Sequence, residues 1–425
     1  MHYHIWTIGC QMNRAESNRI AGFLEYLGYI CSPQIENADL LVLNTCMVRQ
    51  HAEDKILSTI STLKGLKRRN SGLRIMVTGC FVTTPIHKLY MHYPHIDLFF
   101  KPGDYRSFLN YLNSHNSTCD TFHNEILLPQ RSATSAFIPI IEGCNNFCSY
   151  CIVPYRRGRE KSRPIDEIVD EINIHIKKGV VEITLLGQNV NSFGRDLPGQ
   201  PDLGDLLYIL NDIEKLKRIR FLTNHPKDMS KKLIEAVASL DKVCEHISLP
   251  FQSGDNDILH AMRRGYTIEH YKELLKEVRE QIPGVALSTD VIVGFPGETD
   301  EQFEHSVELI KETRFDSVHI AAYTPRPGTI ATRKYRDDVP SLIKKQRLEK
   351  IENIQTHIAA EINAGLQDTI VEVLVEGEKK EKLYGRTRSD KLVFFISEAD
   401  YTGQLVNLRI IETSPWSLQG EPVDN

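Results

Sequence analysis

The sequence predicts an α/β protein in three parts: an N-terminal parallel α/β sheet domain, a central partial (β/α)6 barrel and a small C-terminal all-β barrel. In residues 1 to about 112, strand-like and helix-like segments alternate, which favours parallel strands joined by crossover helices. The alternation resumes with longer units from 137 to about 362, whereas the remaining residues form only short strand-like segments separated by turns. We therefore expect domains at residues 1–115, 130–360 and 363–425.

The N-terminal part contains three apolar segments that predict buried strands, each followed by a helical pattern. We expect strands at about 3–9, 39–45 and 74–79, and helices at about 14–27, 51–69 and 85–92. Residues 113–135 are polar and without regular pattern, so they are expected to link the first two domains.

Six apolar segments in the central part predict six barrel strands. The segments are FIPIIEG (137–143), EITLLGQ (182–188), RIRFLTN (218–224), HISLPFQ (246–252), ALSTDVIVG (286–294) and SVHIAAYT (317–324). An eight-unit barrel usually needs about 250 residues, so six units in about 225 residues fit a partial barrel. A long polar helix at about 340–362 leads to four further strand-like segments, TIVEVLVEG, LYGRTR, KLVFFIS and QLVNLRIIE.

Composition and charge indicate a soluble globular protein. Hydrophobic residues make up 41% and charged residues 25%, which is typical of a chain with a large core. No apolar run approaches the roughly 20 residues that cross a bilayer, and MHYHIWTIGC lacks a secretory signal, so a cytoplasmic protein without a membrane partner is expected. The net charge of −5 means that any RNA site has to be a local basic patch.

Three of the nine cysteines end the three N-terminal strands. IWTIGC ends at Cys10, LLVLNTC at Cys46 and IMVTGC at Cys80. In a reducing compartment, an odd number of cysteines favours metal ligation or catalysis over disulfides. Because ligands gather at the carboxyl ends of parallel strands, the three thiols are expected to converge on one site. The alternative is that they are ordinary buried cysteines at strand ends by chance.

A second set, Cys144, Cys148 and Cys151, lies in GCNNFCSYC at the end of the first barrel strand. The CxxxCxxC spacing allows three thiolates to hold three irons of a [4Fe–4S] cluster and leaves the fourth iron open, whereas ferredoxin clusters use four cysteines. An open position is what a catalytic metal site keeps for substrate. A zinc knuckle or three unrelated core thiols are the alternatives, although zinc normally needs a fourth Cys or His and none follows in the loop.

The CxxxCxxC loop after the first strand of a six-unit barrel resembles the radical S-adenosylmethionine (SAM) enzymes. A cysteine-bearing sheet, a radical-SAM barrel and a small C-terminal β-barrel, in that order, resemble the methylthiotransferase family over essentially the whole chain. The matching stretches are GCQMN (9–13), NTCMVR (44–49), TGC (78–80), GCNNFCSYCIVPYRRGRE (143–160), LLGQNVNSFG (185–194), NHPKD (224–228), LPFQSG (249–254) and STDVIVGFPGET (288–299).

This resemblance implies two [4Fe–4S] clusters and SAM as cofactors. The 144–151 cysteines would hold the cluster that binds SAM, and the three strand-end cysteines would hold a second cluster thought to carry or donate sulfur. An external electron donor of the flavodoxin or ferredoxin type would supply the electron that cleaves SAM to a 5′-deoxyadenosyl radical. No catalytic residue is therefore expected beyond the two clusters.

Four residues at barrel strand ends are expected to contact SAM. Gln188 and Asn189 lie at the mouth of the second strand, the end that carries chemistry in barrel folds. Asp290 and the turn that begins at Gly294 resemble the region of the family that packs against SAM. The alternative for each pair is an ordinary loop cap or turn.

The C-terminal part is expected to bind tRNA through a local basic cluster. Residues 363–425 contain 7 Lys/Arg and 11 Asp/Glu, yet Lys380, Arg386 and Arg388 lie close together around an aromatic residue. A cationic loop with an aromatic residue is typical of small β-barrels that hold single-stranded nucleic acid, and this stretch resembles the family's TRAM domain. The alternatives are a barrel that only packs on the enzyme, or RNA binding by the arginines of 156–159.

Within the family, GCQMN resembles the branch that inserts sulfur and a methyl group at C2 of N6-isopentenyl-adenosine, 3′ of the anticodon in tRNA. Branches that modify N6-threonylcarbamoyl-adenosine in tRNA or an aspartate of a ribosomal protein are the alternatives. NHPKD and HISLPFQSG differ from the family's usual SHP and HLHLPVQSG. A non-enzymatic RNA-binding protein with zinc sites is a further alternative, and it predicts colourless rather than brown protein.

Overall fold

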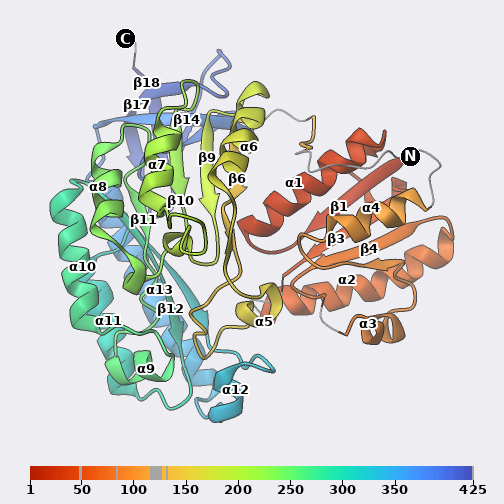
Figure 1. The fold of residues 1–425 in the computed structure, drawn as a ribbon. Coiled ribbons are helices and arrows are strands. Elements are labelled where there is room, and N and C mark those ends of the chain that lie inside the picture. The colour runs from red at the N-terminus through yellow and green to blue at the C-terminus, as the bar shows by residue number, and fades with distance from the viewer. Residues whose placement is uncertain (47–49, 83–84, 115–126, 131–132, 424–425) are drawn as a thin grey trace. The chain divides into compact units, whose positions relative to one another are not determined.

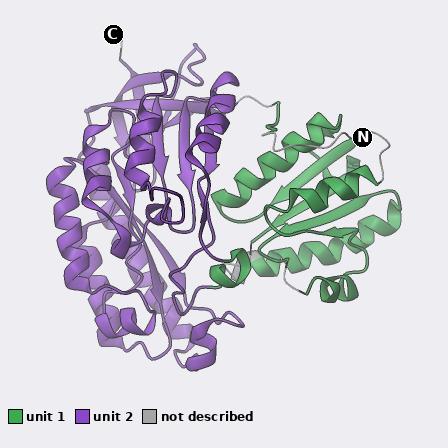
Figure 2. Cartoon of the chain, in the orientation of Figure 1, with its two compact units in different colours: residues 1–131, 152–158 green, residues 132–151, 159–425 purple. Residues whose placement is uncertain are grey.

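The computed structural model describes residues 1–46, 50–82, 85–114, 127–130 and 133–423. The chain divides into two compact units, which are coloured separately in Figure 2. Unit 1 comprises Met1–Arg131 and Ile152–Gly158, and unit 2 comprises Ser132–Cys151 and Arg159–Asn425.

Unit 1 contains a five-stranded parallel sheet in the order β2-β1-β3-β4-β5 (Figure 1). Its strands are β1 (His2–Thr7), β2 (Ile30–Cys31), β3 (Leu40–Thr45), β4 (Arg74–Gly79) and β5 (Leu98–Phe99). Its helices are α1 (Gln11–Tyr26), α2 (Gln50–Arg69), α3 (His87–His92), α4 (Tyr105–Asn113) and α5 (Val153–Arg157). The three predicted strands and helices are confirmed. Strands β2 and β5 were missed because two residues show no periodicity, whereas α4 was missed although its buried Phe108, Leu109 and Leu112 follow helical spacing.

Strand β3 shows that both faces of this sheet are covered. All six of its residues are buried, and successive side chains point to opposite faces. Leu40 packs with Ile20 of α1 and Phe108 of α4, whereas Leu41 packs with Ile56 of α2. Because helices cover both faces, the carboxyl ends of the strands are the place left for a functional site.

Unit 2 begins with six parallel barrel strands, which confirms the predicted partial barrel. They form two sheets, β10-β9-β6 and β11-β12-β13, joined by a bridge between Ile219 and Val243. The strands are β6 (Ser135–Pro139), β9 (Glu182–Leu186), β10 (Arg218–Phe221), β11 (His246–Ser248), β12 (Ala286–Val293) and β13 (Ser317–Ala322). The helices are α6 (Ile165–Lys177), α7 (Leu203–Asn211), α8 (Lys231–Ser239), α9 (Asn256–Ala261), α10 (Ile268–Gln281), α11 (Asp300–Thr313) and α12 (Ile330–Lys334). Two short strands, β7 (Ile141–Glu142) and β8 (Lys161–Ser162), pair antiparallel at the two ends of the segment that carries the cysteine loop.

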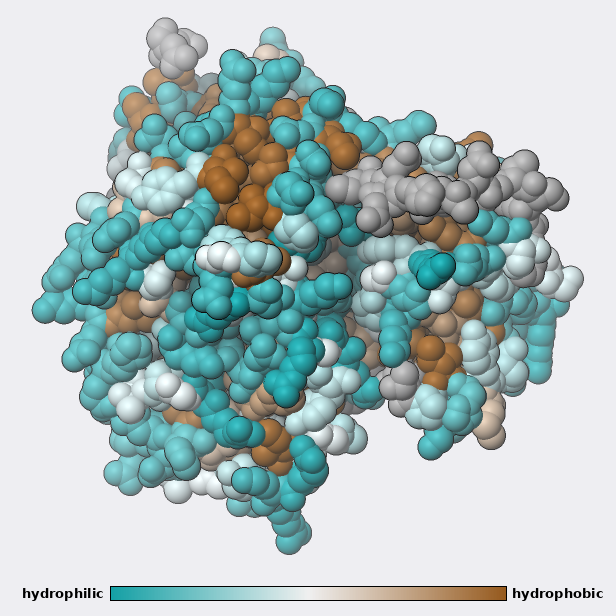
Figure 3. Space-filling model, in the orientation of Figure 1, coloured by the Kyte–Doolittle hydropathy of each residue, from teal (hydrophilic) through white to brown (hydrophobic). Residues whose placement is uncertain are grey.

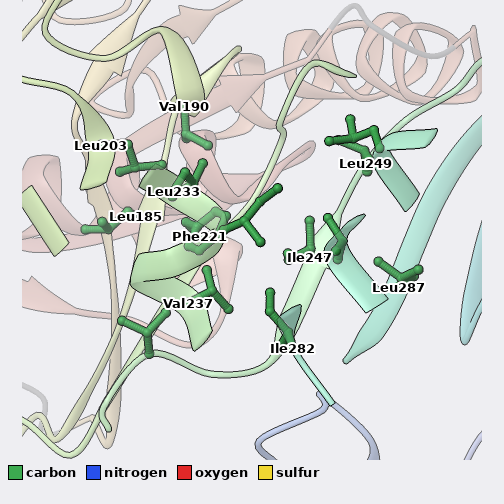
Figure 4. Packing of buried hydrophobic residues seen from close by; sticks show 14 of the residues in the cluster. Leu185, Val190, Leu203, Phe221, Leu233, Val237, Ile247, Leu249, Ile282 and Leu287 are labelled. Atoms are coloured by element: carbon green, nitrogen blue, oxygen red, sulfur yellow. The ribbon is translucent and has the colours of Figure 1, made fainter. Parts of the chain in front are cut away.

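The barrel strands and the outer helices share one hydrophobic core (Figure 4). Leu185, Phe221, Ile247 and Leu287 come from four successive strands, β9 to β12, and none is more than 1% exposed. Buried polar side chains, among them Glu182, Arg220 and Ser288, occupy the alternate positions of these strands, so the apolar core lies on one side of the strands and polar groups lie on the other.

Helix α13 (Ser341–Ala364) leads into a closed five-stranded barrel in the order β14-β15-β16-β18-β17. Its strands are β14 (Ile370–Lys379), β15 (Lys382–Thr387), β16 (Leu392–Phe395), β17 (Leu405–Thr413) and β18 (Leu418–Pro422). The long helix and the all-β barrel confirm the prediction. Strand β18 was missed because its sequence, LQGEP, contains two residues that sequence analysis assigns to turns.

Buried arginines of β10 fasten this C-terminal barrel to the partial barrel. Arg218 is fully buried, and its Nη2 lies 2.8 Å from Glu372 Oε1 of β14. Arg218 and Arg220 also donate to carbonyl oxygens of residues 386–388 at 2.7 to 2.8 Å. The planar guanidinium groups of both arginines therefore bind the end of β15 and the residue that follows it.

Arg388 makes the reciprocal contact from the C-terminal barrel. Its Nε and Nη2 each lie 2.7 Å from a carboxylate oxygen of Glu245. The same guanidinium donates to the carbonyls of Asp241 and Val243 at 2.9 and 2.7 Å. Burial alone would raise the pKa of Glu245, but the hydrogen bonds from Arg388 lower it below its usual value.

We expect Arg388→Ala to destabilise unit 2 by roughly 1–3 kcal/mol at pH 7, because hydrogen bonds to charged groups are lost and Glu245 is left without this partner. The depressed pKa of Glu245 means that the pair stabilises the fold above about pH 4.5 and loses this effect as the pH falls further. The melting temperature of Arg388→Ala should therefore be lower than that of wild type at pH 7, and the two should become equal in acid. Lys380→Ala, at an exposed position, serves as the control; equal melting of the Arg388 variant and wild type at pH 7 would contradict the docking role.

The face of the molecule shown in Figure 3 is mainly hydrophilic, with apolar atoms gathered over the part of unit 2 around α6 and α7. Tyr208 and Ile209 of α7 are 44% and 43% exposed. Within the described ranges, no helix is both long and apolar enough to span a bilayer.

Candidate active site

The three strand-end cysteines lie at one edge of the unit 1 sheet. Strands β1, β3 and β4 are neighbours and parallel, with Thr45 opposite Gly79. Cys46 and Cys80 directly follow β3 and β4, and the Cys80 amide donates to the Thr45 carbonyl at 2.9 Å. Cys10 is the residue that precedes α1. The topology therefore brings three distant cysteines to the carboxyl ends of adjacent strands.

Two glycines allow the backbone to approach closely at this edge. Gly9 has φ +132°, and a Cβ there would lie 2.5 Å from the Cβ of Cys46. Gly79 has φ +91°, and a Cβ there would lie 2.2 Å from the Thr45 carbonyl oxygen. Any larger residue would have to displace the neighbouring strand end, so the glycine before Cys10 and the one before Cys80 are structural requirements.

Asn13 connects the cysteine loops. It is fully buried, and its Nδ2 donates to the carbonyls of Ile8 and Thr45 at 3.0 and 2.9 Å. Its Oδ1 lies 3.7 Å from the Cys10 sulfur, and Asn44 Nδ2 donates to its carbonyl at 2.8 Å. The asparagines of GCQMN and NTC therefore hold the loops that present the thiols.

Two arginines of α5 approach this site within unit 1. Arg157 Nη2 donates to Asn13 Oδ1 at 3.1 Å. Burial lowers the pKa of Arg156, while nearby Cys80 and Glu53 counter that effect. Positive charge beside thiols favours their anionic form, so these arginines suit a site that binds metal through thiolates.

The loop with Cys144, Cys148 and Cys151 lies in unit 2 and is held by defined polar contacts. Gln188 Oε1 accepts from the Gly143 amide at 2.6 Å, directly before Cys144. The Ser149 hydroxyl donates to the carbonyl at residue 261 at 2.8 Å. Gln188, predicted to contact SAM, therefore also supports the cysteine loop.

A polar pocket of about 260 Å³ opens beside this loop. It is lined by Asn145, Asn146, Glu160, Arg195, Asp196 and Lys227. Two cations and two carboxylates in one pocket suit a ligand group that carries charge and hydrogen-bonding atoms.

The mouth of β9 and β10 carries buried polar atoms without partners among the described residues. Asn189 Nδ2 donates to Asp228 Oδ2 at 2.7 Å, but Asn189 Oδ1 has no hydrogen bond. The Lys227 amide donates to His225 Nδ1 at 3.3 Å, so the proton of the neutral ring is on Nε2, which is also unpaired. Burial, with Arg264 and Lys227 nearby, lowers the pKa of His225 to about 2 and keeps the ring neutral. The mouth therefore offers one acceptor and one donor to a ligand.

The cysteine arrangement fits iron–sulfur clusters better than a single ion. Across the residues that the structure covers, no three His, Cys, Asp or Glu side chains meet closely enough to hold one metal ion. None of the cysteines of the two sets forms a disulfide within the described part of the chain. Each cysteine that holds a four-iron cluster binds a different iron, so the ligands need not converge on one point. Burial raises the pKa of Cys144 to about 11, so metal binding there has to displace a proton.

Asp290 and Gly294 have local structural roles. The Asp290 carbonyl accepts from the Gln252 amide at 2.9 Å, and Asp290 pairs in register with His319 of β13. Gly294 has φ +70°, and a Cβ there would lie 2.4 Å from Lys344 Cγ of α13. Packing of Lys344 thus accounts for the glycine without a ligand, and SAM contact by these two residues stays a prediction.

The basic cluster of the C-terminal barrel is largely neutralised. Arg388 binds Glu245 as described above, and Arg386 forms ion pairs inside the barrel at 3.4 and 3.5 Å. Lys379 and Lys380 are exposed at the turn between β14 and β15, and no hydrogen bond or ion pair within the described part of the chain involves either side chain. Lys380 has φ +53°, an uncommon conformation for a residue other than glycine.

Sequence reasoning missed four residues of these sites. Asn13 was quoted in a motif, but nothing in the motif showed its contacts. Arg157 was grouped with a solvated basic run, and His225 was quoted only within NHPKD. Arg264, which lies 3.4 Å from Cys148, had no local signal, because the contact joins residues 116 positions apart.

Comparison with known families gives three matches in order along the chain. Residues 2–101 match the uncharacterized protein family UPF0004, residues 138–310 the Radical SAM superfamily and residues 367–423 the TRAM domain. The structure is similar in fold to the radical S-adenosylmethionine methyltransferase TsrM from Kitasatospora setae, with a TM-score of 0.57, 14% identity, and coverage of 78% of this chain and 77% of that chain.

Relatives match over nearly the full length. The tRNA-2-methylthio-N(6)-dimethylallyladenosine synthase of Dehalococcoides mccartyi (strain CBDB1) is 48% identical over 425 residues, which are 99% of this chain and 98% of the relative. The protein of the same name from Thermoanaerobacter pseudethanolicus is 45% identical over 439 residues and covers 100% of this chain and 93% of the relative. The resemblance to the methylthiotransferases is thus confirmed, and the chain belongs to the tRNA-2-methylthio-N(6)-dimethylallyladenosine synthase family.

Proposed function

We propose that this protein is a radical-SAM methylthiotransferase that adds a methylthio group at C2 of N6-isopentenyl-adenosine, 3′ of the anticodon in tRNA. The observation that carries the proposal is 48% identity, over 99% of the chain, to a relative with this named activity. Two separate three-cysteine sets support it, one at the carboxyl ends of three parallel strands of unit 1 and one on the single loop that follows β7 in unit 2. The proposed cellular location is the cytoplasm, and the proposed electron donor is a small flavodoxin- or ferredoxin-type protein.

The proposed cofactors are SAM and two [4Fe–4S] clusters, one for each cysteine set. When bound, the cluster at 144–151 supplies one-electron cleavage of SAM, which is chemistry strong enough to remove the hydrogen from an adenine carbon that ordinary acid–base groups cannot activate. The chain itself positions these groups. Gln188 orients the loop before Cys144, and Asn13 with Arg157 holds the loop around Cys10.

The polar mouth of the barrel is the proposed place for SAM and the substrate base. Asn189 offers a buried acceptor and His225 a buried donor there. Because His225 stays neutral, it can donate a hydrogen bond without adding charge to the site. The nearby pocket lined by Arg195 and Lys227 can take a charged group of SAM or a phosphate of RNA.

Genetic deletion tests this function directly. Mass spectrometry of tRNA nucleosides should show that 2-methylthio-N6-isopentenyl-adenosine disappears and N6-isopentenyl-adenosine accumulates when the protein is absent. Wild-type protein should restore the product, and Cys148→Ala should not. If the loss instead affects methylthio-threonylcarbamoyl-adenosine or a ribosomal-protein aspartate, the alternative branch is correct. Colourless, zinc-loaded protein would support the non-enzymatic alternative.

The proposed tRNA contact in the C-terminal barrel centres on Lys379 and Lys380. Arg386 and Arg388 are weaker candidates, because each would have to release a carboxylate partner to reach a phosphate. The two exposed lysines have no partner to release among the described residues.

We expect Lys379→Ala with Lys380→Ala to weaken tRNA binding and to flatten its salt dependence by about 0.7–0.9 log units of slope per lost phosphate contact. SAM cleavage without RNA should be unchanged, because the cysteine loop lies in another part of unit 2. Binding titrations at several salt concentrations measure both effects.

A double variant at exposed lysines of two helices, Lys276→Ala with Lys345→Ala, is the matched charge control. Both doubles remove the same net charge, so only a specific site distinguishes them. If the salt dependence of tRNA binding flattens equally in the two double variants, the effect comes from net charge, and the turn with Lys379 and Lys380 is not a specific tRNA contact.

A further inference from the structure

A buried guanidinium reaches a cysteine of the 144–151 loop. Arg264 is 4% exposed, and its Nη1 lies 3.4 Å from the Cys148 sulfur. The same nitrogen lies 3.5 Å from the Tyr150 hydroxyl, and Nη2 donates to the Pro250 carbonyl at 2.9 Å. Its Nε donates to the Tyr266 hydroxyl at 3.2 Å, so each nitrogen of the fork has a partner.

The turn after α9 places the Arg264 side chain in the protein interior. Arg263 has φ +60°, an uncommon left-handed conformation for an arginine. The Arg264 amide then closes back on the Leu259 carbonyl at 3.0 Å. This local strain is compensated by surrounding contacts, as is common where a side chain is held for function.

The charge of Arg264 has no carboxylate partner among the described residues, although other buried arginines of unit 2 do. Arg220 is paired with Glu182 at 3.0 Å and Arg347 with Glu298 at 2.6 Å. A buried charge without an opposite charge is strongly unfavourable. The sulfur of Cys148 is the group near Arg264 that becomes anionic when it binds metal, so a thiolate-bound cluster would balance the buried cation.

We propose that Arg264 is a positioning residue that raises the reduction potential of the cluster bound by Cys144, Cys148 and Cys151. Reduction adds one electron from the external one-electron donor and no proton, so the cluster gains one unit of negative charge. A fixed cation that donates to a ligand sulfur stabilises that added charge, and hydrogen bonds to cluster sulfurs are a recognised determinant of potential. The inference rests on the radical-SAM part of the proposed function.

The test measures the potential of this cluster by itself. Full-length protein with Cys10, Cys46 and Cys80 changed to Ala should hold about four irons, so that redox titration followed by electron paramagnetic resonance reports one cluster. In this background, Arg264→Gln should lower the ratio of reduced to oxidised cluster at a fixed potential by about tenfold, which is about 59 mV for a one-electron couple. Arg264→Lys, which keeps the charge, should change the ratio by less than about threefold.

Tyr266→Phe is the matched control for a purely mechanical role. It removes the hydroxyl that braces Arg264 and the carbonyls of Pro250 and Phe251, but leaves the cation beside Cys148. Its potential should stay at the wild-type value. An unchanged potential in Arg264→Gln, or an equal shift in Arg264→Gln and Tyr266→Phe, would overturn the proposal.

If Arg264→Gln does not retain the cluster, its potential cannot be measured, and Arg264→Lys then tests the proposal. Retention of iron and wild-type potential in Arg264→Lys would support a requirement for charge, whereas loss of iron or a tenfold shift there would refute it. The readout does not depend on the substrate. If Arg264→Gln shifts the potential but the protein modifies a different nucleoside, this inference holds and the proposed substrate is wrong. If the potential does not shift but the nucleoside is the proposed one, this inference is wrong and the proposed substrate holds.

Discussion

Replacing Cys10 by alanine should stop methylthio insertion into tRNA while SAM cleavage to 5′-deoxyadenosine continues. Cys10 lies in unit 1 at the edge formed by β1, β3 and β4, whereas the loop proposed to bind the SAM cluster lies in unit 2. We expect methylthio product to fall by more than about 100-fold, because loss of a group that merely supports a metal ligand already costs 10–100-fold. Chromatography of 5′-deoxyadenosine and of tRNA nucleosides from one reaction measures both outcomes.

Cys31→Ala is the matched control for Cys10→Ala. Cys31 also lies in unit 1, but it is in β2, away from the three strand ends that carry the other cysteines. Both activities should survive this change. If Cys10→Ala instead reduced SAM cleavage and sulfur insertion to the same degree, the strand-end cysteines would have a structural role and the division of labour would be wrong.

Gly79→Ala should prevent assembly of the strand-end cluster, although it changes no cysteine. A methyl group at this position meets the Thr45 carbonyl oxygen at 2.2 Å, and φ is +91°. Left-handed strain costs roughly 1–2 kcal/mol and overpacking a further 1–3 kcal/mol, so we expect a total of roughly 2–5 kcal/mol. Because Cys80 is the next residue, iron content after reconstitution should fall from about eight to about four.

Gly28→Ala is the control for Gly79→Ala, because it introduces backbone strain without a steric clash. Gly28 has φ +81°, similar to Gly79, but no atom lies within 4 Å of the position that its Cβ would take. This variant should lose only roughly 1–2 kcal/mol and should keep about eight irons. Equal iron content in the Gly79 and Gly28 variants would show that the approach to Thr45 is not needed for the cluster.

Much of the architecture was predictable because its signals are local. Apolar segments followed by helical periodicity identified β1, β3 and β4, and parallel topology predicted that their carboxyl ends meet. The same logic located the six barrel strands. Two-residue strands such as β2 and β5 contain too few residues for any period to show, and the structure was needed to find them.

The partners of charged residues were not predictable, because they depend on contacts between distant segments. A run of basic residues near 380–391 indicated nucleic-acid binding, but Arg388 meets a carboxylate 143 positions earlier, at Glu245. The same holds for Arg264 and Cys148, separated by 116 positions. Sequence shows where charge is concentrated, whereas only the fold shows which charges are already neutralised.

Helix α5 has a consequence for how the gene can be divided. It belongs to unit 1 but is encoded after the first strand and the cysteine loop of unit 2. During synthesis, the hydrogen bond from Arg157 to Asn13, beside Cys10, can therefore form only after the cysteines of the other set have left the ribosome. Recombination at residue 131 would part Asn13 from its arginine partner. The two units are therefore expected to be inherited together and not exchanged as separate modules.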